Sequence, residues 1–73
     1  MCRVIKQSTI MNTILALGLA ATPSQVQAHV LRGEVRIRTG GILRGIPDAS
    51  RPMPVGHHIL VVGQRHAHVV VTT

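Results

Sequence analysis

The feature of the sequence that most constrains the fold is an apolar run over residues 10–21. Arg3 and Lys6 precede this run without any acidic residue, and Pro23 follows it. Proline has no backbone N–H and ends a helix. A positive start, a short apolar core and a polar stretch that leads to small side chains are typical of a secretory signal peptide. The sequence therefore predicts a signal-peptide helix over residues 1–28, cleaved between Ala28 and His29.

Two other interpretations of the apolar run are less favoured. The run has 12 residues, whereas a helix needs about 20 to cross a bilayer, so a permanent membrane anchor is not expected. A buried helix of a globular domain would need cover on nearly every face, and the remaining chain looks too small to supply it. We therefore expect an exported protein, periplasmic or secreted, that meets the membrane only through its signal segment.

The composition of residues 29–73 predicts a marginal fold. This part holds six arginines, two acidic residues and all five histidines, and it lacks cysteine and aromatic residues. A chain of about 40 residues seldom folds without disulfides, a metal or oligomerisation. We expect a small β-rich segment, partly disordered and not an enzyme, with no catalytic residues. The absence of aromatic residues also leaves open a truncated or spurious product without its own function.

The pattern of side chains divides this β-rich segment into two hairpins. Apolar and charged residues alternate over residues 30–39, as in a half-buried strand, and Gly40 and Gly41 provide a turn before a returning strand at 42–46. The first predicted hairpin is thus 29–46. A proline-rich linker follows at 47–56. The second, histidine-rich hairpin is 57–73, with its turn at Gly63 and Gln64.

Three histidines of the second hairpin are the candidate metal ligands. With Gly63 and Gln64 as the turn, Val61 pairs with His66, Ile59 with His68, and His57 with Val70. Side chains alternate across a strand, so His57, His66 and His68 share one face, and His58 lies on the other. Three imidazoles on one surface are suitable ligands for Zn²⁺, Cu²⁺ or Ni²⁺. Surface histidines without a dedicated ligand are the commoner meaning of such a pattern, because histidine is frequent on solvated surfaces and His-x-His on a strand arises by chance.

Cleavage before His29 would add a fourth candidate ligand. The new N-terminal histidine would offer its amine and its ring nitrogen together, a pair that suits Cu²⁺. In this one feature the chain resembles exported copper proteins of the CopC type and the copper monooxygenases, and the resemblance implies a copper role for His29.

The first hairpin presents a row of arginines, Arg32, Arg36 and Arg38, around Glu34. A solvated charged face is the commoner meaning of such a row, and an acidic protein partner or an anionic surface is the functional alternative. Nucleic acid is not expected, because the chain is predicted to be exported and has no aromatic side chain to stack on bases.

The alternating residues Gly33, Val35 and Ile37 resemble the N-terminal strand of chaperone-usher pilins. That resemblance implies a structural subunit that adds its strand to a partner's sheet or self-associates through its strands. The sequence thus predicts a small exported binding protein, with metal binding through histidines as its first function and strand addition as the alternative.

Overall fold

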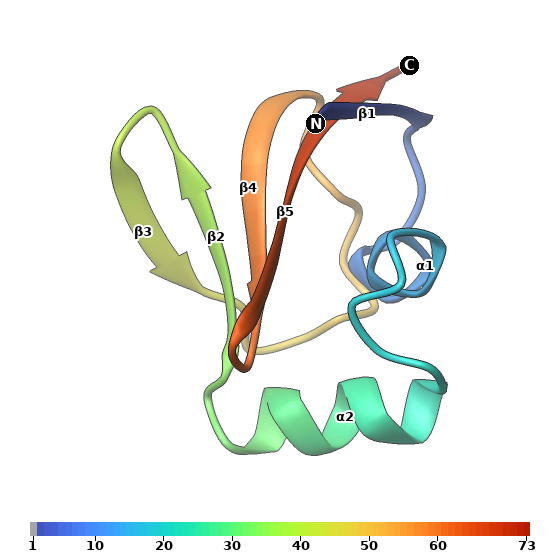
Figure 1. Ribbon diagram of the computed structural model, residues 1–73, viewed down its shortest axis with the longest axis vertical. Helices are drawn as coiled ribbons and strands as arrows, with labels where there is room; N and C mark the ends of the chain where they lie inside the picture. The colour runs from blue at the N-terminus through green and yellow to red at the C-terminus, as the bar shows by residue number, and fades with distance from the viewer. Residues whose placement is uncertain (1) are drawn as a thin grey trace.

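The computed structural model describes residues 2–73, which form a five-stranded mixed sheet and two short helices (Figure 1). The strands are β1 (Cys2–Lys6), β2 (Val35–Thr39), β3 (Ile42–Gly45), β4 (Gly56–Val62) and β5 (Arg65–Thr72). The helices α1 (Ile10–Ala16) and α2 (Pro23–Leu31) lie between β1 and β2. The strand order is β1-β5-β4-β2-β3, in which β1 runs parallel to β5 and every other neighbouring pair is antiparallel.

The predicted fold class, a signal-peptide helix followed by two marginal hairpins, is wrong. Residues 2–28 do not form one separate helix: a strand starts at Cys2, and two short helices follow it. The Ala28–His29 bond lies inside α2. None of the helices in residues 2–73 is long and apolar enough to span a bilayer.

The apolar run is instead buried against the sheet. Ile10 and Ile14 of α1 and Val26 of α2 are at most 2% exposed. They pack on the inner face of the sheet, which is formed by Val35, Ile37, Leu60, Val62, Val69 and Val71. The strands therefore supply the cover for the apolar run that the sequence analysis did not expect, and the two parts of the chain form one core.

Both helices are capped at both ends, and the caps set where each helix begins and ends. Thr9 and Thr22 are the N-caps, and their hydroxyls accept hydrogen bonds from the backbone N–H groups of Asn12 and Gln25. Each helix ends in a Schellman motif. In α2 the Gly33 N–H donates to the Val30 carbonyl, and the Glu34 N–H donates to the His29 carbonyl. Gly33 has φ +71°, a left-handed conformation that glycine adopts without strain.

The proline-rich segment between β3 and β4 packs against the start of α1. Met53 is fully buried and Ala49 is 2% exposed. The N–H groups of Ile10 and Met11 donate to the carbonyls of Arg51 and Ala49. This segment thereby closes one side of the core.

Candidate functional site

The candidate site is a groove between α2, the loop after α1 and the turn that joins β4 to β5. It has a volume of about 570 Å³ and is lined by Leu19, Ala20, Ala21, Gln25, Ala28, His29, Arg32, Val62, Gln64 and Arg65. Its floor is apolar, because Leu19, Ala20 and Val62 belong to the core. Its polar groups stand on the walls, so a ligand would meet charge and amide groups around an apolar base. We call this site the α2 groove.

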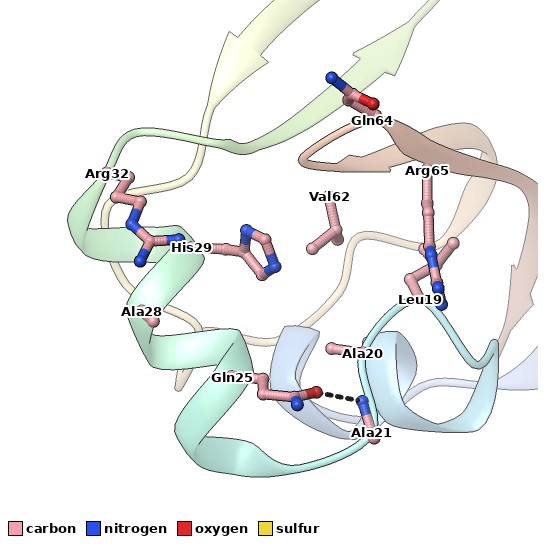
Figure 2. Close-up of a pocket in the computed structure, with 10 residues that line it drawn as sticks. All are labelled: Leu19, Ala20, Ala21, Gln25, Ala28, His29, Arg32, Val62, Gln64 and Arg65. Atoms are coloured by element: carbon pink, nitrogen blue, oxygen red, sulfur yellow. Dashed lines mark hydrogen bonds between the residues drawn. The ribbon is translucent and has the colours of Figure 1, made fainter.

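Two arginines stand on opposite sides of the α2 groove, with the His29 ring between them (Figure 2). Arg32 is the C-cap of α2, and its side chain is 66% exposed. Arg65 begins β5, and its guanidinium donates to the Gly18 carbonyl at 3.5 Å, just after α1. The two positive charges therefore come from segments far apart in the sequence and meet only in the folded chain.

The His29 imidazole forms the centre of the α2 groove and is held by Glu34. His29 Nδ1 lies 2.8 Å from Glu34 Oε1. The turn glycine Gly63 sits directly over the ring: a Cβ at this position would lie 3.2 Å from His29 Cε1. The Gly63 N–H also donates to the Glu34 carbonyl. These contacts fix α2 and the β4–β5 turn relative to one another.

The positive charge of the chain is largely unneutralised. The sequence has eight Lys and Arg residues, two acidic residues and a net charge of +6. Glu34 is engaged by His29, with Arg32 Nη1 3.9 Å away. Asp48 accepts hydrogen bonds from the Ser50 side chain and backbone N–H, which lower the pKa of Asp48 below its usual 3.8. Within residues 2–73, no ion pair forms at Arg38, Arg44, Arg51 or Arg65.

The histidines of the second hairpin lie as the sequence predicts, but they do not form a metal site in this structure. The pairs Val61–His66, Ile59–His68 and His57–Val70 are all present, so His57, His66 and His68 share the face of the sheet opposite the helices. Across the described part of the chain, no group of three or more His, Cys, Asp or Glu side chains is close enough to hold a metal ion. His29 lies in α2, against the β4–β5 turn at Gly63, and is not part of this face.

His58 is a structural residue. It is 7% exposed and points into the core face. Its Nε2 lies 2.9 Å from the Pro54 carbonyl, and its Nδ1 lies 2.7 Å from the Thr39 hydroxyl. A carbonyl only accepts, so Nε2 must carry a proton. His58 thereby ties β4 to β2 and to the segment before it.

The α2 groove was missed because five of its ten lining residues were assigned to a cleaved segment, and the other five come from separate parts of the chain that only the fold brings together. The sequence does contain the start and stop signals of α2. Thr22-Pro23-Ser24-Gln25 is a typical helix start, and Gly33 is a typical helix end. No family model, curated protein or solved structure matches the chain.

Proposed function

We propose that this chain is a non-enzymatic nucleic-acid-binding domain that holds the backbone of a folded RNA in the α2 groove. The observation that carries the proposal is the pair Arg32 and Arg65, which stand on opposite walls of one groove. Arginine side chains are the commonest partners of backbone phosphates.

The surroundings of the two arginines favour a large polyanion. A net charge of +6 on a molecule of 26 × 23 × 22 Å gives a positive potential that attracts phosphates from a distance. The amide of Gln64 lies at the edge of the same groove and is exposed. Amides and arginines together match a ribose-phosphate backbone, which presents both hydroxyl groups and phosphates.

Nucleic acid was not expected as a ligand mainly because the chain was predicted to be exported. Support for the proposal comes from residues 2–28, which form β1, α1 and most of α2 and contribute core side chains instead of one separate signal helix. The lack of aromatic residues still disfavours stacking on single-stranded bases. A double-helical stem, bound by its shape and phosphates, is therefore the ligand that fits best.

The test is the affinity of the full chain for a fluorescently labelled RNA hairpin, measured by anisotropy. The double variant Arg32→Gln, Arg65→Gln should bind about tenfold more weakly, or about 1.4 kcal/mol. Its matched control is Arg44→Gln, Arg51→Gln, which removes the same charge from exposed arginines outside the groove. Equal losses in the two double variants, or no binding by the wild type, would contradict the proposal. If a DNA duplex of the same sequence binds as tightly as the RNA, the proposed contacts to phosphates stand and the proposed preference for RNA is wrong.

A further inference from the structure

The sheet has a second face that none of the helices within residues 2–73 covers (Figure 1). The pairing register places four rows of side chains on it, the outermost being Lys6 and Thr72 at the end of the β1–β5 pairing. One row is Val4, Val70 and His57; the next is Cys2, His68, Ile59, Arg38 and Leu43; the last is His66, Val61, Arg36 and Gly45. We call this surface the open face.

The middle of the open face is apolar. Ile59, Val61 and Val70 are only partly covered, while Leu43 is 43% and Val4 70% exposed. A solvated sheet face normally carries polar side chains at alternate positions. Strands that are apolar on both faces are instead typical of a sheet covered on both sides. On the open face β4 and β5 carry Ile59, Val61 and Val70 together with the exposed His57, His66 and His68. The partly covered apolar side chains are the ones that point to a second layer.

The part of the open face formed by β2, between β4 and the edge strand β3, is positive and has no acidic residue. Arg36 and Arg38 stand beside Val61 and Ile59 across the β2–β4 pairing, and they line a cavity of about 340 Å³ together with Leu43, His66 and His68. Arg36 Nε is buried and has no hydrogen-bond partner in the described part of the chain. A buried donor without a partner is costly, and a carboxylate satisfies an arginine through two parallel hydrogen bonds.

From these observations we infer that the open face binds an acidic amphipathic helix of a partner protein. Its apolar stripe would lie on Ile59 and Val61 of β4 and Val70 of β5, and its carboxylates would face Arg36 and Arg38. Helix-on-sheet packing is the common way to cover such a face.

The charges disfavour two other occupants. A second copy would bring Arg36 and Arg38 against the same positive residues, because both acids of the chain, Glu34 and Asp48, lie away from this face. A nucleic acid would satisfy the arginines but would leave the apolar strip of Ile59 and Val61 against a charged backbone. The open face and the α2 groove have no lining residue in common, so the inference is independent of the proposed function.

The test uses the full chain labelled with ¹⁵N and a synthetic peptide with leucines at helical spacing on one side and glutamates beside them. A scrambled peptide of the same composition is the control for charge alone. We expect the amphipathic peptide to shift the amide signals of β2, β4 and β5, and to bind at least about tenfold more tightly than the scrambled peptide.

Two variants make the site specific. Arg36→Gln should weaken peptide binding about tenfold, whereas Arg51→Gln, which removes the same charge outside the open face, should change it less than about twofold. Adding the RNA hairpin should leave peptide binding in place. The inference would be overturned by equal binding of the scrambled peptide, by shifts confined to α2, by the absence of shifts, or by RNA that displaces the peptide from these strands.

Discussion

His29 Nδ1 lies 2.8 Å from Glu34 Oε1, and this contact joins the last turn of α2 to the residue before β2. Both side chains are partly exposed, 29% for His29 and 41% for Glu34. Partly exposed pairs of this kind contribute little to the free energy of unfolding. The main effect of Glu34 is therefore to place a negative charge beside the α2 groove.

Replacing Glu34 by Gln should tighten RNA binding about threefold, since it removes the negative charge next to the groove arginines. The free energy of unfolding should change by less than about 1 kcal/mol. Asp48→Asn removes the other acid of the chain, which lies outside the groove, and should leave the affinity unchanged. Anisotropy and chemical denaturation give the two quantities; weaker binding of RNA by the Glu34→Gln variant would contradict the assignment of the groove.

The N-terminal third of the chain should be essential for folding. Ile14 is fully buried, so Ile14→Ala should cost about 2–5 kcal/mol of the free energy of unfolding. Val4 is 70% exposed, and Val4→Ala should cost less than about 0.5 kcal/mol. A chain without residues 1–28 should show no cooperative unfolding transition. Urea denaturation followed by circular dichroism tests all three, and a cooperative transition in the truncated chain would mean that the strands fold alone.

The sequence predicted the second half of the chain better than the first. The turns of both hairpins could be predicted because glycine occupies them. The β4–β5 pairing has the register that a turn at Gly63 and Gln64 predicts. The β2–β3 turn at Gly40 and Gly41 is likewise found, although the preceding strand begins at Val35, because residues 30 and 31 belong to α2.

The first half was misinterpreted because an apolar run of 12 residues has the same local pattern in a signal peptide and in a buried helix. The difference lies in long-range contacts: Ile10 and Ile14 meet strands that come 20 or more residues later. The parallel pairing of β1 with β5 joins the two ends of the chain and has no local sequence signal. The α2 groove depends on the same contacts and was therefore not predictable from spacing.

His57 is exposed and its neighbour His58 is buried, so their substitutions should change the free energy of unfolding to different extents. His58→Gln should lower the free energy of unfolding by about 1–3 kcal/mol, because it disturbs the hydrogen bonds to Thr39 and Pro54 in a buried site. His57 is exposed, and His57→Gln should stay within about 0.5 kcal/mol of the wild type. Equal effects of the two variants in urea denaturation would contradict the placement of His58 in the core.

Asp48 should titrate below its ordinary pKa because it accepts hydrogen bonds from Ser50, with a further contribution from the charge of Arg51. A carboxyl whose pKa is lowered by folding stabilises the folded state fully above its unfolded pKa, and this contribution is lost as the pH falls through the folded pKa. Ser50→Ala should raise the Asp48 pKa toward 3.8 by removing the strongest of these hydrogen bonds. A carbon-detected NMR titration measures the change, and an unchanged pKa would contradict the role of the Ser50 hydroxyl.

The most direct test of the proposed function is the salt dependence of RNA binding. Each phosphate contact contributes about −0.9 for duplex DNA, and a similar order for an RNA stem, to the slope of log affinity against log salt concentration. The account predicts that Arg32→Gln, Arg65→Gln makes this slope shallower by about 2, while Arg44→Gln, Arg51→Gln changes it by less than about 1. The same slope for the wild type and the groove variant would show that Arg32 and Arg65 do not contact phosphates and would contradict the account.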